Sequence, residues 1–387
     1  MRIAYYSAGL SQSGGSGAHA HGLADAWARS GHVVLRLPDA ASAGPVEATR
    51  LRKPRLSTGL GIQLARDARA RLRALANVGG LTKRMSAFSA ELLIARRGRY
   101  DYTLDALLAS TRQPWVAEVN GLSWIEQRDL LGAPPLSWEI AREERFVREA
   151  DAAVAITDES RQQLLACGVQ PEKIAVVHNG ADVQAFRPGL EVDRHVAEWA
   201  RSFSPVVAFC GTGAYTFDHA TLCTAMTTLA TLLPTAGFLF VGPSPADVAT
   251  WCPASLRLAD RLLCTSRVPH AQVPSLIAAA DLFWSAYRND YGSPLKQFEY
   301  MAMGRPIVVA GDGQAAWLVD AAECGRAVHR QDASGLAASV ADLWALEGSL
   351  RRELGENGRT WTVTNASWDA VAQRLLDACG SLRTARS

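Results

Sequence analysis

Hydrophobic residues in this chain gather in short continuous runs, and longer amphipathic stretches separate the runs. A short run predicts a buried strand, and apolar residues spaced three and four positions apart predict a helix with one buried face. The predicted strands fall in two groups, at 3–7, 33–37, 100–104, 115–120, 152–157 and 173–177 and then at 206–210, 237–241, 261–266, 281–286, 306–310 and 326–329. Helices are predicted between them, among others at 17–29, 158–167, 271–280 and 295–303. This alternation is typical of an α/β protein with mostly parallel sheets.

The two groups of strands predict two Rossmann-like domains. The periodicity is interrupted near 183–193, where Phe186-Arg187-Pro188-Gly189 precedes a short polar helix. We therefore expect an N-terminal domain at 1–185, a C-terminal domain at 186–365 and a last helix within 366–387 that packs back on the first domain. Two such domains facing each other create a cleft at the carboxyl ends of both sheets, where ligands bind in this architecture.

Composition narrows the class of protein. Apolar residues make up 48% of the chain and charged residues 20%, the balance of a globular protein. The first residues predict a buried strand rather than a signal peptide, and no apolar segment approaches the roughly 20 residues that cross a bilayer. The seven cysteines have no C-x-x-C spacing, so we interpret them as buried thiols of a reducing compartment without a metal site. These observations predict a cytoplasmic protein.

The most informative segment is 291–306, which follows a predicted strand and opens a helix with Gly292, Ser293 and Pro294. Unpaired N–H groups and the helix dipole favour a diphosphate at such a helix start. Lys296 adds a positive charge, and Glu299 lies on the same helical face, where it can accept hydrogen bonds from ribose hydroxyls. The alternative to this donor-binding interpretation is an ordinary amphipathic helix on which Lys296 and Glu299 form a solvated ion pair. Because the chain has 36 Arg and only four Lys, a lysine here indicates that a compact ammonium is wanted.

Segment 291–306 resembles the donor-binding motif of family 4 glycosyltransferases, G-x-P-x-K-x-x-E-Y-M-A-x-G-x-P. Three further segments are similar to family motifs in the expected order: the glycine-rich loop at 14–19, the V-x-P-N-G-V-D-like run at 176–188 and the stretch at 268–281. The resemblance implies a GT-B fold, an acceptor-binding first domain, a second domain that binds a nucleoside diphosphate sugar, and transfer with retention. It also implies that no metal or cofactor is required, because Lys296 and helix amides would neutralise the diphosphate.

The resemblance also implies roles for single residues. Glu299 would hold the donor ribose, backbone groups near Val268 and His270 the base, and 292–295 the distal phosphate. The predicted donor-binding residues are Gly15, Ser16, Gly211, Thr212, Val268, His270, Arg288, Tyr291, Gly292, Ser293, Pro294, Leu295, Lys296 and Glu299.

The chain departs from the family pattern at two donor positions. Tyr291 stands where relatives often have a glutamate that contacts the sugar, with Asp290 adjacent. The loop after the second domain's first strand offers only His219 where relatives often have a basic residue, and Arg288 is the candidate for the missing charge.

In the first domain the catalytic candidates are Asn120, Glu118 and His19, which join Lys296. Asn120 ends a strand where many relatives place a histidine near the transferred sugar, and its amide can donate and accept hydrogen bonds. Glu118 is either a sugar contact or a buried carboxylate paired with an arginine. His19 is a better pocket candidate than His21. The expected mechanism is closure of Gly15 and Asn120 over the bound donor, followed by internal return.

Other classes of function stay open. Residues 15–20 fit the dinucleotide pattern G-x-G-x-x-A, and Asp39 lies where a ribose-binding acid is expected, but the first glycine stands well past the end of the strand. An NAD-linked enzyme is therefore the weaker hypothesis. A sugar-nucleotide epimerase of the same architecture and a non-catalytic nucleotide-sugar-binding subunit are the main alternatives.

Residues 50–99 carry thirteen Lys or Arg against two acids. Leu64, Ala68, Leu72 and Leu75 share a helical face, and a second helix is expected through Met85, Phe88 and Leu92. Three interpretations stay open: peripheral contact with an anionic membrane at the cytoplasmic face, attraction of an anionic soluble acceptor, or plain solvated faces. Nucleic-acid binding is disfavoured, since the segment lacks interleaved aromatic residues. The acceptor is accordingly expected to be a glycan, a lipid-linked sugar or a small molecule.

Overall fold

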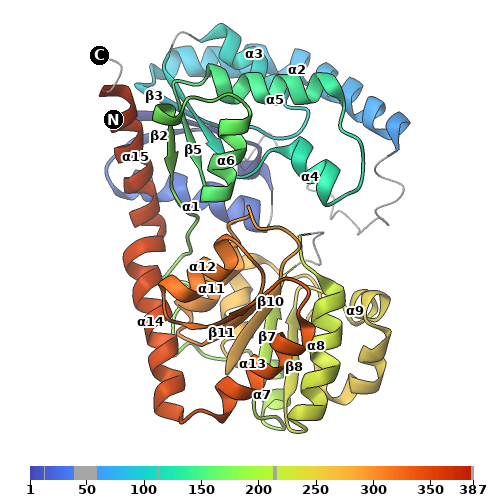
Figure 1. Ribbon diagram of the computed structural model, residues 1–387. Coiled ribbons are helices and arrows are strands. Elements are labelled where there is room, and N and C mark those ends of the chain that lie inside the picture. Colours follow the sequence, from blue (N-terminus) through green and yellow to red (C-terminus); the bar gives the residue numbers. More distant parts are fainter. Residues whose placement is uncertain (13, 39–58, 112, 212–215, 385–387) are drawn as a thin grey trace. The chain divides into compact units, whose positions relative to one another are not determined.

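The structure, a computed structural model, describes residues 1–12, 14–38, 59–111, 113–211 and 216–384 (Figure 1). The chain divides into two compact units, each with its own sheet. Unit 1 comprises Met1–His178 and Asp369–Ser387, and unit 2 comprises Asn179–Trp368. Within the described residues, no helix has both the length and the apolar character needed to cross a membrane.

Unit 1 is built on a six-stranded parallel sheet of order β2-β1-β3-β4-β5-β6. Its strands are β1 (Arg2–Ser7), β2 (Val33–Leu37), β3 (Leu92–Arg96), β4 (Trp115–Val119), β5 (Ala152–Ala155) and β6 (Ile174–Val176). The central strand β1 pairs with both neighbours, so that Ile3 lies opposite Val34 on one side and Leu92 on the other. Five residues of β1 are buried, as expected for a strand covered on both faces.

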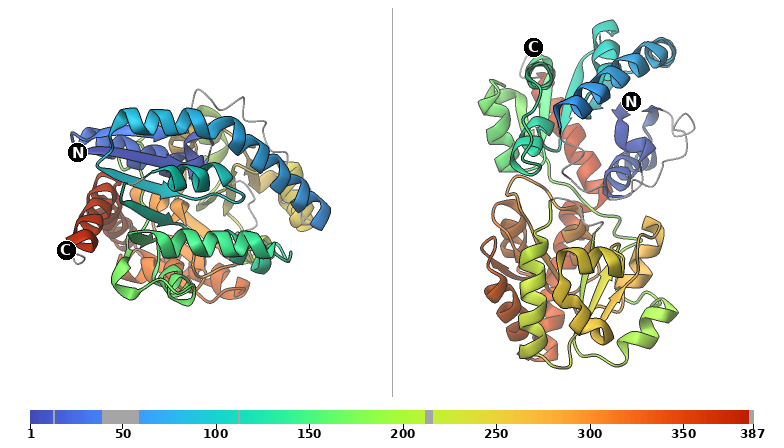
Figure 2. Two further views of the ribbon diagram at one scale, coloured as in Figure 1. Left: turned by 90° about the horizontal axis from the view of Figure 1, so that it is seen from above. Right: turned by 90° about the vertical axis from the view of Figure 1, so that its right-hand side faces the viewer.

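Helices cover both faces of this sheet (Figure 2). The connections contain η1 (Ala8–Ser11), α1 (Gly15–Arg29), α2 (Leu60–Phe88), α3 (Tyr102–Ser110), α4 (Ser123–Asp129), α5 (Ser137–Glu149), α6 (Asp158–Ala166) and η4 (Pro171–Lys173). The last helix, α15 (Trp368–Thr384), packs on α1, where the Trp27 indole donates to the Ala372 carbonyl at 3.1 Å. An exposed Arg29–Asp369 ion pair of 2.7 Å lies beside this contact.

The strand predicted at 100–104 is wrong. Asp101 caps α3 by accepting from the Leu104 amide at 3.1 Å, so this stretch begins a helix. The third strand is instead Leu92–Arg96, which was expected to continue a second basic helix. Helix α2 ends where Ser89 adopts a left-handed φ of 51°. The apolar run that follows is buried between β1 and β4, because a central strand needs apolar side chains on both faces.

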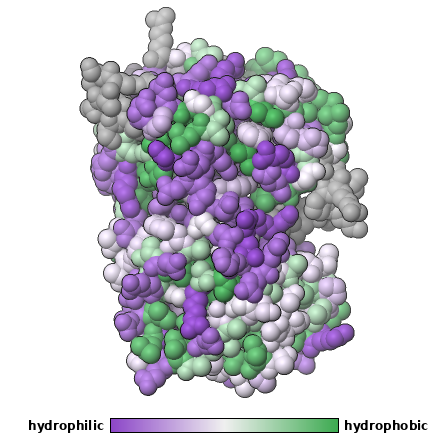
Figure 3. Space-filling model, viewed as in Figure 1, coloured by the Kyte–Doolittle hydropathy of each residue, from purple (hydrophilic) through white to green (hydrophobic). Residues whose placement is uncertain are grey.

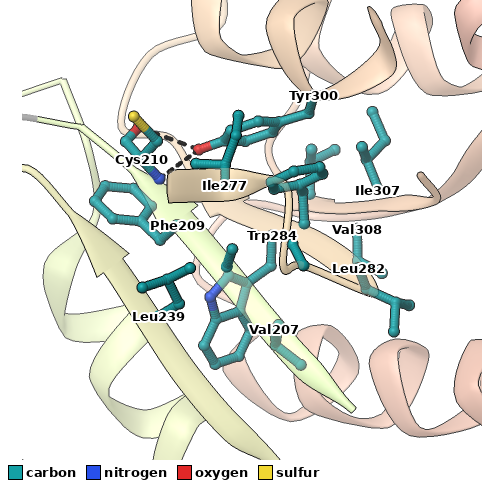
Figure 4. Packing of buried hydrophobic residues seen from close by; sticks show 14 of the residues in the cluster. Val207, Phe209, Cys210, Leu239, Ile277, Leu282, Trp284, Tyr300, Ile307 and Val308 are labelled. Atoms are coloured by element: carbon teal, nitrogen blue, oxygen red, sulfur yellow. Dashed lines mark hydrogen bonds between the residues drawn. The ribbon is translucent and has the colours of Figure 1, made fainter. Parts of the chain in front are cut away.

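Unit 2 has a second parallel sheet, of order β12-β11-β10-β7-β8-β9. Its strands are β7 (Val206–Cys210), β8 (Gly237–Val241), β9 (Leu262–Cys264), β10 (Leu282–Ala286), β11 (Ile307–Ala310) and β12 (Gly325–Val328). The buried core gathers around β7 and β10, where Trp284 and Val207 lie among aliphatic side chains (Figure 4). Phe283 and Tyr300 stack with ring centroids 4.3 Å apart, which fixes the helix that carries Tyr300 against the sheet.

The connections of unit 2 are mostly helical. They contain α7 (Arg194–Ala200), α8 (His219–Leu232), α9 (Pro245–Trp251), η5 (Pro253–Arg261), η6 (His270–Gln272), α10 (Val273–Ile277), α11 (Leu295–Ala302), α12 (Gln314–Ala321), α13 (Ala333–Ala345) and α14 (Gly348–Ala366). The two sheets with their helices confirm the predicted α/β architecture of two Rossmann-like domains.

The interpretation of every cysteine as a free thiol is wrong for one pair. Cys223 on α8 and Cys252 after α9 form a disulfide with Cα atoms 5.3 Å apart. The remaining five are free, and four of these are buried. The disulfide ties α9 to α8, and the scattered spacing of the cysteines gave no sign of it.

Candidate functional site

The strand order of unit 2 reverses between β10 and β7, and ligands of open α/β sheets bind outside the carboxyl ends of the strands at such a point. The register of β7 on β10 ends at Ala208 and Phe283. Beyond it, the Tyr300 hydroxyl accepts from the Cys210 amide at 2.6 Å and donates to the Cys210 carbonyl at 3.1 Å (Figure 4). Tyr300 therefore fixes α11 to the end of β7 at the switch point.

Helix α11 begins at Leu295 and carries Lys296 and Glu299 into a buried polar group. The Lys296 ammonium donates to Glu299 Oε2 at 2.7 Å, and His270 Nε2 lies 2.8 Å from Glu299 Oε1. The Lys296 and Glu299 side chains are 17% and 4% exposed, so this is a buried ion pair and not the solvated pair of the alternative interpretation. Lys296 also contacts the Cys210 thiol. An ammonium has three N–H donors, so one can serve a ligand besides these two partners.

The electrostatics keep this group charged. Burial alone would lower the pKa of Lys296, but Cys210 and Glu299 raise it well above its usual range. Burial alone would raise the pKa of Glu299, but Lys296 and His270 hold it below its ordinary value of 4.5. Burial raises the pKa of the Cys210 thiol to about 11. At neutral pH the site therefore offers an ammonium, a carboxylate and a protonated thiol.

The segments at 176–188 and 291–306, far apart in sequence, are bonded to each other. The Asn179 side-chain amide donates to the Ser293 carbonyl at 2.9 Å, and its backbone N–H donates to Ser293 Oγ at 3.4 Å. At the other end of α11, Gly304 has a φ of +69°, and a Cβ there would lie 2.9 Å from Pro188 Cγ. Both ends of α11 are thus held by one short segment, and Asn179 positions the turn that precedes Lys296.

The other predicted donor residues lie around the same sheet edge but not in one group. Val268 lines a pocket of about 360 Å³ with residues of α7, β9 and α10. Arg288 lines a different pocket of about 520 Å³ together with Asp312 and Arg330, at the carboxyl ends of β10, β11 and β12. Neither pocket has Lys296 or Glu299 in its lining, and the role of Arg288 as a supplementary charge stays a prediction.

The turn predicted to bind the donor, 291–294, lies between β10 and α11. Tyr291 and Ser293 are buried, and Gly292 and Pro294 lie with them in the turn that leads into α11, whose first residue is Leu295. A Cβ on Gly292 would approach the Asn289 side chain to 3.2 Å, so a larger residue would crowd the turn. Gly211 follows β7 directly, and Thr212 lies outside the described residues.

In unit 1, Glu118 is a buried carboxylate with two partners. Its Oε2 accepts from the Tyr5 hydroxyl at 2.8 Å, and its Oε1 is bonded to His19 Nε2. The three residues come from β4, β1 and α1, so they tie the helix to the sheet. Burial alone would raise the pKa of Glu118, but His19 and then Arg96 lower it. We interpret Glu118 as the group that positions His19, since both of its oxygens are engaged.

The remaining unit 1 candidates lie at the carboxyl edge of the first sheet. Helix α1 begins at Gly15 and Ser16, and the preceding Gly14 has a φ of +83°, which favours glycine. Asn120 follows β4 directly and is half-buried, and Gly121 after it has a φ of +139°. The structure brings His19 and Glu118 together, and the buried Oδ1 of Asn120 has no hydrogen-bond partner among the described residues.

Sequence reasoning missed three contributors to the site: Cys210, Tyr300 and the Asn179 side chain. Tyr300 and Asn179 lie inside the motif segments 291–306 and 176–188. The motifs therefore included these residues, but they did not indicate what the two side chains do. His270 was expected to act through its backbone, but its side chain contacts Glu299. Nothing in the sequence pointed to Cys210, because its role depends on which residue of α11 faces the end of β7.

Comparisons with known families match each of the two halves of the chain. Residues 13–185 match the model described as Glycosyltransferase Family 4, and residues 204–345 match that described as Glycosyl transferases group 1. D-inositol 3-phosphate glycosyltransferases of Mycobacterium bovis and Mycobacterium tuberculosis are 29% identical over 256 residues, which cover 63% of this chain and 51% of theirs. The chain thus spans about half the length of the curated relatives it matches.

Solved structures share the fold over nearly the whole chain. Sucrose-phosphate synthase from Thermosynechococcus elongatus has a TM-score of 0.75 at 18% identity, with 99% of both chains covered. The Anabaena protein HepE in complex with UDP-glucose has a TM-score of 0.70 at 16% identity, with 98% of this chain and 100% of that one covered. The two family models and the fold shared with these structures point to the same family as the motif segments of the sequence. The chain belongs to the family 4-like glycosyltransferases of the GT-B fold.

Proposed function

We propose that this protein transfers a sugar from a nucleoside diphosphate sugar to an acceptor hydroxyl, with retention of anomeric configuration and without a metal ion. The observation that carries the proposal is the buried group of Lys296, Glu299 and His270 at the switch point of unit 2. The HepE complex with UDP-glucose supports a nucleotide-sugar donor, and the curated relatives support a glycosyl transfer.

In the proposed reaction the donor diphosphate binds at the start of α11. The Lys296 ammonium and the backbone amides at the helix start stabilise the negative charge that develops on the leaving diphosphate. Glu299 accepts hydrogen bonds from the ribose, and His270 holds the carboxylate in place for that role. The leaving phosphate takes the proton of the acceptor hydroxyl as the new glycosidic bond forms on the same face of the sugar.

Unit 1 supplies the acceptor side in this proposal. His19, held by Glu118, and the Asn120 amide are the groups proposed to contact the sugar or the acceptor. The acceptor class is a glycan, a lipid-linked sugar or a small molecule, each of which presents a hydroxyl.

The direct test is calorimetry with UDP-, GDP- and ADP-sugars, followed by product analysis by NMR in the presence of EDTA. We expect one nucleotide family to bind, and transfer to an acceptor hydroxyl with the anomeric configuration of the donor. Binding of none of the donors would overturn the proposal. Donor binding with epimerised sugar, or with no transfer across an acceptor panel, would instead support the epimerase or the non-catalytic subunit. Loss of transfer in EDTA would overturn metal independence.

A further inference from the structure

Helix α2 of unit 1 buries polar side chains and exposes leucines. Gln63 and Asp67 on it are only 2% and 6% exposed, whereas Leu64, Leu72 and Leu75 are 42%, 67% and 78% exposed. A surface helix of a globular protein normally turns its apolar side to the core. The distribution on α2 is reversed over its N-terminal half.

Hydrogen bonds of the buried Asp67 and Gln63 side chains fix this orientation. Asp67 accepts from the Tyr102 hydroxyl and from the Trp138 indole, the latter at 3.3 Å. Gln63 accepts from the Gln127 side-chain amide at 2.7 Å. Turning the leucines inward would break these hydrogen bonds. The polar groups that now bond to Asp67 and Gln63 would then lack partners, which destabilises the fold where they are shielded from water. The leucine face of α2 is therefore held outward by the fold.

The exposed leucines are aligned rather than scattered. At about 100° per residue, Leu64, Leu72 and Leu75 fall within an arc of about 80° on the helix. Arg69 and Arg73, both exposed, lie further round the helix, about 60° and about 100° beyond the edge of this arc. Hydrophobic and hydrophilic residues are interspersed on the face shown in Figure 3, so single exposed leucines need no explanation. Helix α2 runs along the outside of its unit (Figure 2). An apolar stripe on such a helix, with exposed arginines further round it, does need an explanation.

We propose that α2 docks the protein on an anionic lipid surface. Leu64, Leu72 and Leu75 enter the boundary between headgroups and acyl chains, and Arg69 and Arg73 contact the lipid phosphates. Charge complementarity selects this occupant, since α2 itself carries six Lys or Arg against one acid, Asp67. A second copy of the chain fits less well, because pairing two α2 helices would bring basic stripes together. This inference does not depend on the proposed reaction.

Each element of the stripe contributes measurably to binding. A leucine moved from water into the apolar boundary strengthens binding about tenfold, and an arginine beside anionic headgroups about fivefold. The arginine contribution is screened by salt, whereas the leucine contribution is not. Docking should therefore weaken in high salt and fail when the leucines become charged.

The test is flotation of the full chain with vesicles of phosphatidylcholine alone or with phosphatidylserine added. We expect flotation with the anionic vesicles only, reduced at high salt and at least tenfold weaker for the Leu72→Asp, Leu75→Asp double variant. The matched control is Leu256→Asp, at a leucine of unit 2 that is 70% exposed, which should float like the original protein.

Three outcomes would overturn the inference. These are absence of the protein from the anionic vesicle fraction, equal flotation with neutral vesicles, and undiminished flotation of the double variant. A dimer in sedimentation that Leu72→Asp, Leu75→Asp abolishes, without flotation, would instead assign the stripe to a second copy. Nucleotide-sugar binding, measured by calorimetry on the same samples, reports separately on the proposed function and should be equal in both variants.

Discussion

Replacing Lys296 with alanine perturbs the proposed donor site most directly. The substitution removes the ammonium and leaves Glu299, 3% exposed, with His270 as its contact on the other oxygen. Two effects must then be separated. One is the loss of a positive charge for the leaving diphosphate, and the other is the cost of a buried carboxylate that has lost its charged partner.

The structure sets the size of both effects. A unit charge about 4 Å from a phosphate oxygen interacts by about 4 kcal/mol at the effective dielectric of a partly buried site, which is about a thousandfold in rate if it acts in the transition state. Breaking a buried ion pair by removing one partner costs about 3 kcal/mol of stability. Lys296→Ala should thus lower turnover about a thousandfold and lower the free energy of unfolding by about 3 kcal/mol.

The double variant Lys296→Ala, Glu299→Gln separates the two effects. It removes the orphaned charge, so urea unfolding should show most of the stability restored while sugar transfer stays about a thousandfold slow. Lys173→Ala, at another of the four lysines, should leave transfer unchanged. Near-normal transfer by Lys296→Ala would refute the phosphate role. Recovery of transfer together with stability in the double variant would show that Lys296 acts only through folding.

Three further predictions concern neighbouring groups. Glu299→Ala should weaken donor binding about tenfold or more, as expected for loss of hydrogen bonds to a charged group, and an unchanged affinity by calorimetry would contradict the ribose role. Asn179→Ala should raise the KM for the donor more than it lowers kcat, because the turn at Ser293 loses its 2.9 Å anchor; equal KM values would argue against positioning. Because the pKa of Glu118 is lowered in the fold, its stabilisation is present above pH 4.5 and is lost as the pH falls through the lower folded value. Glu118→Gln should flatten that fall in urea unfolding between pH 6 and pH 3, and parallel curves would disprove the assignment.

The strands of unit 2 could be predicted from the sequence because burial on both faces makes them continuous apolar runs. The runs at Val206–Cys210 and Gly237–Val241 are strands with the predicted bounds. The failure at Leu92–Arg96 has a local cause, since this strand follows a helix of similar apolar content without a glycine or proline between them. Three residues separate the two, and the first of them, Ser89, has a left-handed conformation that serine seldom adopts.

The candidate site was predictable where it depends on local order and not where it depends on tertiary contact. The start of α11 and the i, i+3 spacing of Lys296 and Glu299 follow from sequence alone. The contact of His270 with Glu299 joins residues 29 positions apart and depends on the packing of unit 2. The same limit applies to α2, where periodicity gives the leucine stripe but cannot tell which side of the helix faces the core. That choice is made by the buried Asp67 and its hydrogen-bond partners.

The buried pair at the start of α11 explains how one helix can serve a charged ligand and still be stable without it. A lone Lys296 ammonium, buried to this degree, would pay a desolvation penalty with nothing to offset it. Glu299 offsets that penalty in the protein alone, and His270 supports the carboxylate from its other oxygen. In the proposed reaction the ammonium gains a second anion when the diphosphate binds, and ribose hydroxyls can then donate to Glu299, so neither charge is left without a partner. The proposed donor site therefore has its charges paired before the donor binds, and the proposal assigns Lys296 to the phosphate and Glu299 to the ribose afterwards.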